Sequence, residues 1–416
     1  MERGREVRRE TTAPWAALCV ALACAFVAIA CLAIPMYVIR PFRPQDPHQL
    51  AFALTVRNAG PWLSGACVVA VLCLVSLLWR RSIGLLSRIA LVSLSVVTLV
   101  AAVLTHVNIF EIMFHPYPLP AFGDAASAQV DTDDKVLVVR IGGVAHAYPI
   151  RTLAYHHIVN DAIDNASIAV TYCTLCHTGL VWNRVLDGRT LYFRLAGINN
   201  GNALLRDEET NSIWQQSTGQ AIFGPLKGRQ LALVRSDELT FGLWREEQPS
   251  GLVLVPDAPY VDEYETKDWE AHIEKTHVVI DTTKSGIAPH ELMLGVTLGG
   301  QGKAFPVKAI LAAKLIQDQI GGSPVLILVG PDQASIRVFQ SRAAQQSLNF
   351  VLARVATAPG NAGIVQDLET QSMWNFQGCA IDGKAKGTCL EPVEVIKDYW
   401  FDWRNYNPST TVYGRK

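Results

Sequence analysis

Two cysteines separated by two residues, Cys173 and Cys176, are followed directly by a histidine, His177, in the segment AVTYCTLCHTGLVW (residues 169–182). Residues of these types at this spacing predict one of three kinds of site. A Cys-x-x-Cys-His sequence can attach a c-type haem, with the thiols bonded to its vinyl groups and His177 as the iron ligand. The same pair can be a redox-active dithiol, or it can chelate a thiophilic metal ion.

The metal-binding hypothesis combines both thiolates with an imidazole. His156 lies 17 residues upstream of Cys173, far enough for the chain to return from a neighbouring element, and His177 is close by. Zinc and copper ions accept mixed thiolate and imidazole ligands. We therefore expect Cys173, Cys176 and His156 to form one site that binds copper or zinc or carries redox equivalents.

Three alternatives give the same cysteines other roles. A thiol-disulfide oxidoreductase acting on exported proteins would use Cys173 and Cys176 as its catalytic pair, although the residues after the motif are typical of a strand rather than of the helix that such a dithiol prefers. A haem bound through Cys173, Cys176 and His177 is less favoured, because the motif lies in an apolar, strand-like run. The two cysteines can also form a plain structural disulfide, as most exported cysteine pairs do.

Three uncharged stretches at the start of the chain predict transmembrane helices. They cover residues 15–39, 60–79 and 89–110, and about 20 apolar residues suffice to cross a bilayer as a helix. The first stretch is longer than the apolar core of a signal peptide, which has about 7 to 15 residues. We expect residues 1–114 to be a membrane anchor.

Basic residues predict the orientation of this anchor, because they favour the cytoplasmic side of short loops. They gather before the first helix and between the second and third, at Arg3, Arg5, Arg8, Arg9, Arg80, Arg81 and Arg88. No Lys or Arg follows the third helix until Lys135. We expect a cytoplasmic N-terminus in the inner (plasma) membrane, with residues 115–416 outside the cytoplasm.

The remaining cysteines have structural interpretations. Five of the nine lie in the apolar stretches, where small packing residues are common: Cys19, Cys24, Cys31, Cys67 and Cys73. Cys379 and Cys389 flank the turn-rich sequence AIDGKAKGT. In an oxidising compartment this pair predicts a disulfide that closes a hairpin.

The outer part of the chain contains an internal repeat. LLRDEETNSIWQ (204–215) returns as IVQDLETQSMWN (364–375), FGLWREEQP (241–249) as WFDWRNYNP (400–408), and GGVAHAYPIR (142–151) as GGQGKAFPVK (299–308). The offsets are 160, 159 and 157 residues, in the same order. We expect two tandem modules, here called the N-terminal half (115–256) and the C-terminal half (289–416), joined by a charged connector (257–288).

Each half has short, alternating apolar runs between Gly, Asp and Asn turns, which predicts a β-rich α+β fold. One short helix is expected in each half, near IRTLAYHHIVND (150–161) and AILAAKLIQDQI (309–320). At an offset of 157, Cys173, Cys176 and His156 fall on Gly330, Gln333 and Ala313. Because these three residues are present only in the N-terminal half, we expect them to act as a unit, with the C-terminal half structural or a wall of the site.

The ordered motifs AYPIR, HHIVND, VTYCTLCHTGLVW and LLRDEETNSIWQQSTGQAIFGPLKGRQL resemble the family of unknown function numbered 3179, which has a Cys-x-x-Cys core. The resemblance covers most of residues 120–256 and, more weakly, 288–414. The family pattern has Glu where this chain has His157. The resemblance implies a domain but no reaction.

Charge and motifs exclude other classes of function. With 36 basic and 37 acidic side chains the chain has a formal net charge of -1, so it lacks the basic excess of a nucleic-acid-binding protein. It has no phosphate-binding Gly-rich loop and no hydrolase signature. The partners we expect are the lipid bilayer and an exported protein or redox partner.

Overall fold

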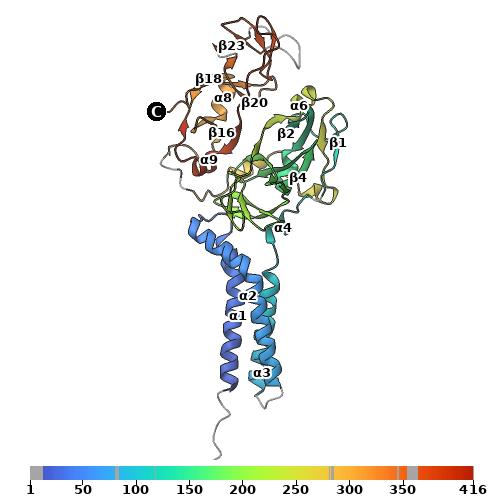
Figure 1. Cartoon of the computed structure of the whole chain (residues 1–416), viewed down its shortest axis with the longest axis vertical. Coiled ribbons are helices and arrows are strands. Elements are labelled where there is room, and N and C mark those ends of the chain that lie inside the picture. Colours follow the sequence, from blue (N-terminus) through green and yellow to red (C-terminus); the bar gives the residue numbers. More distant parts are fainter. Residues whose placement is uncertain are drawn as a thin grey trace, which may run out of the picture. The chain divides into compact units, whose positions relative to one another are not determined.

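A computed structural model describes residues 13–79, 84–117, 119–280, 282, 285–343, 346–353 and 364–415. The chain divides into two compact units, Met1–Ile109 and Phe110–Lys416. The first unit consists of long helices, and short strands run throughout the second (Figure 1). The predicted class is confirmed as three N-terminal helices long and apolar enough to span a membrane, followed by a β-rich α+β domain.

The first unit consists of α1 (Ala13–Val38), α2 (Pro47–Trp79) and α3 (Leu85–Leu104), all long and apolar enough to span a membrane. Helix α2 has 33 residues and begins 13 residues before the predicted apolar stretch. Small side chains on one face of α1 are buried, namely Ala17, Ala21, Ala25 and Ala28, which lets neighbouring helices approach closely. The basic residues Arg3, Arg5, Arg8, Arg9, Arg80 and Arg81 lie outside the described residues.

The N-terminal half of the second unit contains three main sheets. Their strand orders are β1 (Phe122–Asp124), β15 (Leu252–Leu254), β3 (Val144–Pro149), β2 (Lys135–Ile141), β14 (Ser236–Thr240); β13 (Leu233–Val234), β6 (Thr178–Asn183), β5 (Ala166–Cys173), β4 (Ile158–Ile163); and β12 (Ala221–Phe223), β11 (Ile213–Gln215), β10 (Asn202–Asp207), β9 (Phe193–Asn199). A small pair, β7 (Val185–Leu186) and β8 (Arg189–Thr190), and two helices, α5 (Ile150–His156) and α6 (Phe241–Glu247), complete it.

The C-terminal half has corresponding sheets. Their orders are β27 (Val395–Tyr399), β16 (Leu292–Leu298), β17 (Gln301–Pro306), β28 (Thr411–Val412); β18 (Leu315–Ile320), β19 (Ser323–Val329), β20 (Ile336–Gln340); and β23 (Phe350–Leu352), β24 (Val365–Asp367), β25 (Met373–Trp374), β26 (Ala380–Asp382). The pair β21 (Arg342–Ala343) and β22 (Gln346–Ser347) and the helices α8 (Val307–Ala313) and α9 (Trp400–Tyr406) follow the same order. Short helical segments outside the halves are α4 (Ile109–Met113), the 3-10 helix Ala258–Glu263 and α7 (Trp269–Ile273).

Equivalent turns in the two halves are held by the same contacts. The indole nitrogen of Trp214 donates to Asp207 at 2.8 Å, and that of Trp374 donates to Asp367 at 2.8 Å. Both carboxylates also accept a hydrogen bond from the backbone amide of the threonine three residues later. A buried carboxylate with several donors fixes the turn in each half, and these repeated residues are therefore structural.

The expected helix at 150–161 is shorter than predicted and a strand takes over its second part. Helix α5 ends at His156, and β4 begins at Ile158. His157 lies between them with φ 61°, a left-handed conformation that ends a helix. Each half also has a second helix, α6 or α9, that the sequence pattern did not predict.

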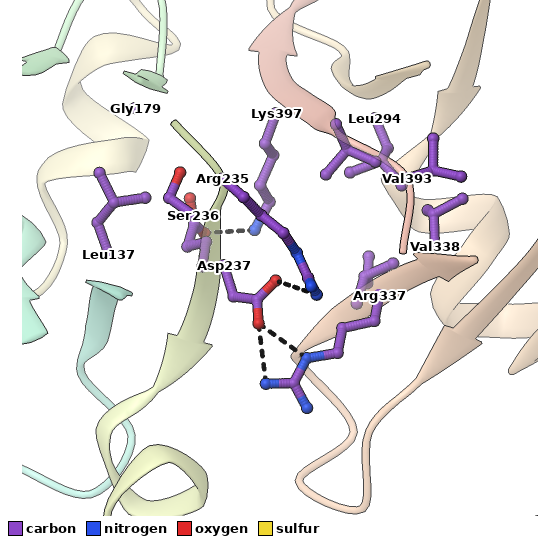
Figure 2. Close-up of a pocket in the computed structure, with 13 residues that line it drawn as sticks. Leu137, Gly179, Arg235, Ser236, Asp237, Leu294, Arg337, Val338, Val393 and Lys397 are labelled. Carbon is purple, nitrogen blue, oxygen red and sulfur yellow. Dashed lines mark hydrogen bonds and ion pairs between the residues drawn. The ribbon is translucent and has the colours of Figure 1, made fainter. Parts of the chain in front are cut away.

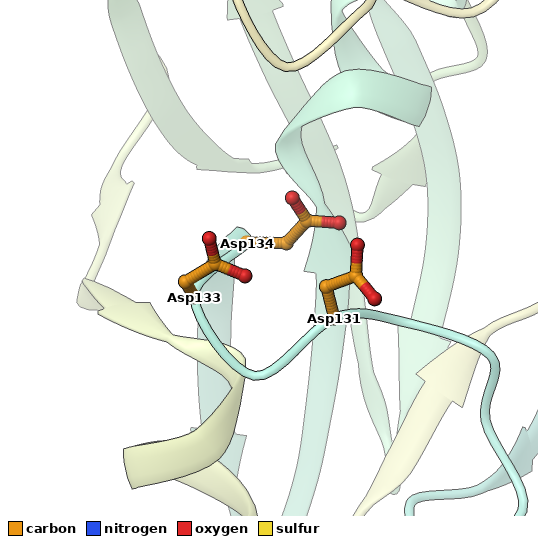
Figure 3. Close-up of side chains that lie close together, drawn as sticks. All are labelled: Asp131, Asp133 and Asp134. Atoms are coloured by element: carbon orange, nitrogen blue, oxygen red, sulfur yellow. The ribbon is translucent and has the colours of Figure 1, made fainter.

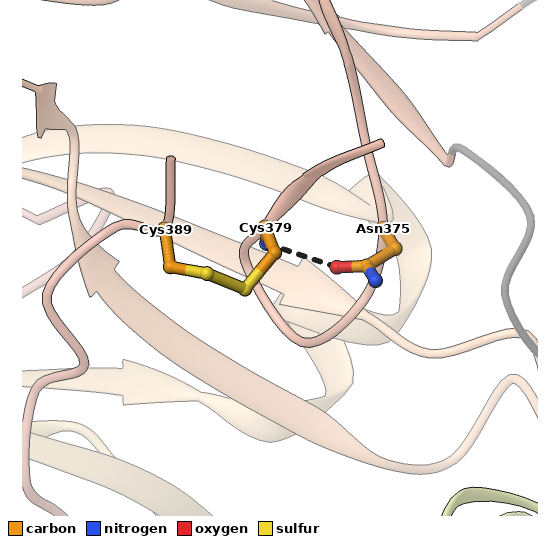
Figure 4. The surroundings of a disulfide bond; sticks show 3 residues. All are labelled: Asn375, Cys379 and Cys389. Atoms are coloured by element: carbon orange, nitrogen blue, oxygen red, sulfur yellow. Dashed lines mark hydrogen bonds between the residues drawn. A yellow bond between two sulfur atoms is a disulfide. The ribbon is translucent and has the colours of Figure 1, made fainter. Parts of the chain in front are cut away.

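The predicted disulfide between Cys379 and Cys389 is confirmed (Figure 4). The two cysteines face each other in an isolated antiparallel bridge. The side chain of Asn375 accepts a hydrogen bond from the amide of Cys379 at 2.9 Å. The crosslink therefore closes a turn that is already held by backbone and side-chain hydrogen bonds.

The hydrophobic cores join the two halves reciprocally. Leu239 and Leu243, from β14 and α6, belong to a core that contains Leu328 and Phe339 of the C-terminal half. Cys173 and Cys176 belong to a core that contains residues of the C-terminal half, Tyr399 and Phe401. Strand β14 and helix α6 of the N-terminal half, and strand β27 and helix α9 of the C-terminal half, thus lie in the same core as residues of the opposite half.

Candidate functional site

The two thiols lie at a β-turn between the neighbouring strands β5 and β6. Cys173 ends β5 and pairs with Thr178, which begins β6, and Cys176 lies in the turn between them. Both cysteines are free and buried, with 3% and 0% of their surface exposed. Their sulfur atoms are 3.4 Å apart, and both thiols donate to the carbonyl of Gly201, at 3.4 and 3.1 Å. The strand pairing therefore positions two sulfurs side by side against one backbone oxygen.

Two carboxyl groups of the C-terminal half lie at this turn. The amide of Tyr399 donates to the carbonyl of Cys176 at 2.9 Å and holds β27 against it. Asp398 accepts a hydrogen bond from the hydroxyl of Thr178 at 2.9 Å. Asp402, on α9, is fully buried and lies close enough to the Cys176 thiol to interact with it. The site is therefore built from both halves.

The carboxyl group of Asp402 is only half satisfied. Its Oδ2 accepts hydrogen bonds from the side chains of Asn202 and Ser217, each at 3.0 Å. Its buried Oδ1 has no hydrogen-bond partner among the described residues. An unpaired oxygen is unfavourable in a low-dielectric interior. Asp402 also interacts with the Cys176 thiol and the Asp398 carboxyl, so a proton shared among these acids, or a cation in its place, would be stabilising here.

The acidic groups at the turn disfavour one another's ionisation. Burial raises the pKa of the Cys176 thiol well above its usual value, and Cys173, Asp402 and Asp398 raise it further. Burial also raises the pKa of Asp402 to about 6, although its interactions with Ser217, Cys176, Asn202 and Asp398 lower it. The pKa of Asp398 is raised by burial and by the charge of Asp402.

No cationic side chain is paired with either aspartate among the residues that the structure describes. Four acidic groups, two thiols and two carboxyls, thus share a buried space without a counter-ion. Groups in such a space hold their protons unless a cation enters. The arrangement can exchange protons for a metal ion.

His177 contacts the connector through its ring. Its Nε2 is 2.7 Å from a carboxylate oxygen of Glu270, and its ring stacks on Trp269 with centroids 5.4 Å apart. Glu270 also accepts from Lys135 at 2.6 Å. Although burial would raise the pKa of Glu270, the hydrogen bond from His177 and the charge of Lys135 lower it well below its usual value. The Nε2 of His177 is therefore already hydrogen-bonded.

His156 is not brought to the thiols. Its Nδ1 lies 2.6 Å from the carbonyl of His115, and its Nε2 lies 3.0 Å from the hydroxyl of Tyr264. The ring packs edge-on against Tyr117 and Tyr155. At the end of α5, this side chain contacts His115 and Tyr117, near the start of the second unit, and Tyr264 of the connector. The expected grouping of His156 with Cys173 and Cys176 is not present in this structure.

Ligand geometry gives one compact acidic group elsewhere. Among the described residues, the side chains of Asp131, Asp133 and Asp134 form the one group of three whose ligand atoms all lie within 4.8 Å of one another (Figure 3). Lys267 already contacts Asp131 at 2.6 Å and Asp133 at 3.2 Å. Lysine thus supplies the positive charge there. The group formed by Cys173, Cys176 and Asp402 is wider than 4.8 Å, so one ion could be shared only after a side-chain movement.

Charged residues bridge the two halves around a small pocket (Figure 2). Arg337 has 4% of its side chain exposed and binds Asp237 at 3.0 Å and both oxygens of Glu247, at 2.7 and 2.8 Å. Lys397 binds Glu238 at 2.5 Å. Lys397 directly precedes Asp398, so this ion pair fixes the strand that carries one of the acids of the site.

Sequence reasoning identified the two thiols and missed Asp398 and Asp402. A signal was available in the repeat. At the offset of 159 residues that aligns FGLWREEQP with WFDWRNYNP, Asp398 and Asp402 fall on Leu239 and Leu243. Aspartate at two positions where the other copy has buried leucine is a departure as specific as that of the cysteines.

Comparison with known proteins identifies one family. The family described as "Protein of unknown function (DUF3179)" matches residues 118–410. No curated protein and no solved structure matches the chain.

Proposed function

Because the chain belongs to the DUF3179 family, whose description states no activity, we propose a function from the site alone: the protein is membrane-anchored and binds one thiophilic metal ion, copper or zinc, through Cys173 and Cys176. One observation carries this proposal. Two free thiols lie 3.4 Å apart in a buried turn, and no described residue supplies a counter-ion to the acids beside them.

The sulfur separation supports chelation. Two sulfurs that bind one zinc ion at about 2.3 Å with tetrahedral angles lie about 3.8 Å apart. The observed 3.4 Å therefore has to change by only a few tenths of an ångström. The carbonyl of Gly201, which accepts from both thiols, keeps the sulfurs on the same side of the turn before any ion arrives.

Burial favours a metal ligand over a nucleophile. A thiol attacks a disulfide as a thiolate, and reactive cysteines are partly exposed with a lowered pKa. Cys173 and Cys176 are buried, and the pKa of Cys176 is raised. A bound cation removes this obstacle, since a coordinating thiol is deprotonated outright.

A reversible disulfide is the second candidate, in which the protein is a thiol-disulfide oxidoreductase acting on exported proteins. The observation that favours it is the same distance, because the sulfurs of Cys173 and Cys176 are near enough to bond after a small approach. A haem bound through His177 is favoured less, because its Nε2 is hydrogen-bonded to Glu270.

The proposal includes a cellular setting. The three apolar helices support anchoring in a lipid bilayer, and the distribution of basic residues supports a cytoplasmic N-terminus with residues 115–416 outside the cytoplasm. The repeated motifs and the matching sheet orders support an origin of the two halves by duplication. The disulfide between Cys379 and Cys389 suits an oxidising compartment.

The test is metal analysis of the full-length protein, purified in detergent under reducing conditions and dialysed against a micromolar mixture of copper and zinc. We expect about one ion per chain, lost in Cys173→Ser and Cys176→Ser. Cys73→Ser is the matched control, because it removes an exposed thiol of α2 and leaves the turn intact. A metal-free wild type with both thiols free by titration would overturn the proposal, and a wild type whose two thiols are oxidised to each other would favour the second candidate.

A further inference from the structure

We propose that Asp402, supplied by the C-terminal half, is the third ligand of the ion held by Cys173 and Cys176, and that its carboxylate makes the site select zinc over copper(I). This inference rests on the proposed function, since it names the remaining ligand and the metal of the same site. Four observations carry it: the reciprocal packing of the halves, the orphaned oxygen of Asp402, the hydrogen bonds that orient its other oxygen, and the charge of the ligand set.

Reciprocal packing provides two equivalent places in one molecule. At one of them the amide of Thr240 donates to the hydroxyl of Ser335, in the turn between β19 and β20. Here the buried side chains of the N-terminal half are Leu239 and Leu243. The turn itself contains one acid, Asp332, which accepts from the hydroxyls of Thr240 and Ser335. The two positions contributed by β14 and α6 are apolar, so the packing of these elements does not require aspartates there.

At the other place the amide of Tyr399 donates to the turn between β5 and β6, at the carbonyl of Cys176. The residues aligned with the two leucines are Asp398 and Asp402, and they are as deeply buried. Burying carboxyl groups without a cation is unfavourable. The two thiols and the two aspartates of β27 and α9 thus occur together at one place, and none of the four is present at the aligned positions of the other, as expected of groups that serve one ligand.

The hydrogen bonds of Asp402 match those of a metal-binding carboxylate. Ligating side chains are oriented by donors that bind the atom not facing the metal. Asn202 and Ser217 both donate to Oδ2, at 3.0 Å, while Oδ1 is buried and has no partner among the described residues. The free oxygen belongs to a carboxyl group that interacts with the Cys176 thiol.

The ligand atoms of Cys173, Cys176 and Asp402 are not all within 4.8 Å of one another, so coordination draws the carboxylate toward the sulfurs. The carboxyl group has to tilt so that Oδ1 approaches the sulfurs while Asn202 and Ser217 keep their hydrogen bonds to Oδ2. Asp398 stays bound to Thr178 and remains beside the site as a neighbour rather than a ligand.

The charge and hardness of this ligand set favour zinc. Two thiolates and one carboxylate carry three negative charges, so a divalent ion leaves one uncompensated charge in the buried site and a monovalent ion leaves two. Copper(I) is satisfied by soft thiolates, whereas zinc readily takes carboxylate oxygen beside sulfur. The carboxylate therefore adds affinity for zinc and little for copper(I).

The experiment compares the two affinities in full-length protein. Apo protein is titrated with Zn²⁺ against a chromophoric chelator and with Cu⁺ against a copper(I) chelator, for the wild type, Asp402→Asn and Asp398→Asn. We expect Asp402→Asn to weaken zinc binding about 10- to 100-fold while copper(I) binding changes little, and Asp398→Asn to have the smaller effect on zinc. Asp382→Asn, an exposed aspartate of β26, is the matched control.

The outcomes separate the two proposals. A wild type that binds neither ion overturns the proposed function. If the wild type binds zinc and Asp402→Asn binds it equally well, the role of Asp402 as a ligand is overturned. If Asp402→Asn loses zinc and copper(I) binding equally, its role in selectivity is overturned. X-ray absorption of zinc-loaded wild-type protein does not depend on the folding of any variant. Two sulfur ligands and at least one oxygen ligand would support the inference, and a shell of sulfur ligands alone would overturn it.

Discussion

Replacing Arg337 by methionine is expected to weaken the interaction between the two halves of the β-rich unit and so to lower the stability of the unit. The guanidinium is 4% exposed and binds Asp237 and both oxygens of Glu247, which is itself only 1% exposed. Methionine keeps an unbranched apolar stem beside the ring of Phe376, over which the guanidinium lies at 4.6 Å. The change therefore removes the charge and leaves Glu247 buried without its partner.

The magnitude follows from burial. Removing one member of a buried ion pair costs about 3–5 kcal/mol, and for a unit as large as Phe110–Lys416 about 2 °C in Tm corresponds to each kcal/mol. We expect Arg337→Met to lower the Tm of the full-length protein in detergent by about 6–10 °C. The exposed pair Arg229 and Asp187, with 48% and 59% of the side chains exposed, is the control. Arg229→Met should cost less than about 1 kcal/mol.

The assay is thermal unfolding followed by circular dichroism, extended to the double variant Arg337→Met/Glu247→Met. Removing both partners eliminates the unpaired carboxylate, so the double variant should be more stable than the sum of the two single changes predicts, by about 0.5–3 kcal/mol. Equal shifts for Arg337→Met and Arg229→Met would refute the reasoning. So would strict additivity of the two changes at the buried pair.

Three further results are expected. His156→Gln should leave the metal content of the protein unchanged and lower its Tm, because both ring nitrogens contact His115 and Tyr264 rather than the thiols; loss of metal would restore His156 as a ligand. Glu270→Gln should destabilise the protein at pH 7 and flatten the fall of its Tm below about pH 5, since a carboxylate with a lowered pKa stabilises the fold above its usual pKa of about 4.3 and loses that effect as pH falls from there toward the lowered pKa; an unchanged acid slope would contradict the ion pair. Metal binding should release about two protons per ion from Cys173 and Cys176 and strengthen as pH rises, measured with an indicator in weak buffer, and pH-independent affinity would argue against thiolate ligands.

Local patterns predicted local structure well in this chain. The alternation in ASIAVTYC corresponds to β5, and the turn-rich sequence between Cys379 and Cys389 is closed by the predicted disulfide. The helix predicted at 150–161 was too long because the apolar spacing continues past His157, whereas the left-handed backbone at His157 ends helix α5. The periodicity of apolar residues does not reveal a single residue whose backbone conformation ends a helix.

The sequence predicted the cysteines of the candidate site but not its aspartates, because the two sets of residues are far apart in the chain. Cys173 and Cys176 share one turn, so their spacing alone brought them together. Asp402 lies more than 200 residues further along the chain and reaches the cysteines through the packing of the two halves, which no local pattern encodes. His156 was grouped with the thiols because a 17-residue separation allows the chain to return and because the other copy lacks it, but its ring contacts His115 and Tyr264 instead.

The division of the site between the halves has an energetic consequence. Two buried thiols and two buried aspartates weaken the interface they occupy as long as no cation compensates them, whereas Leu239 and Leu243 carry no such penalty at the equivalent place. The ion pairs of Arg337 with Glu247 and of Lys397 with Glu238 tie the same two halves together beside the pocket. They hold the acids and the thiols in contact in the absence of an ion, and a bound cation then adds its own stabilisation to the interface by linkage. Metal occupancy and the association of the two halves are thus expected to rise and fall together.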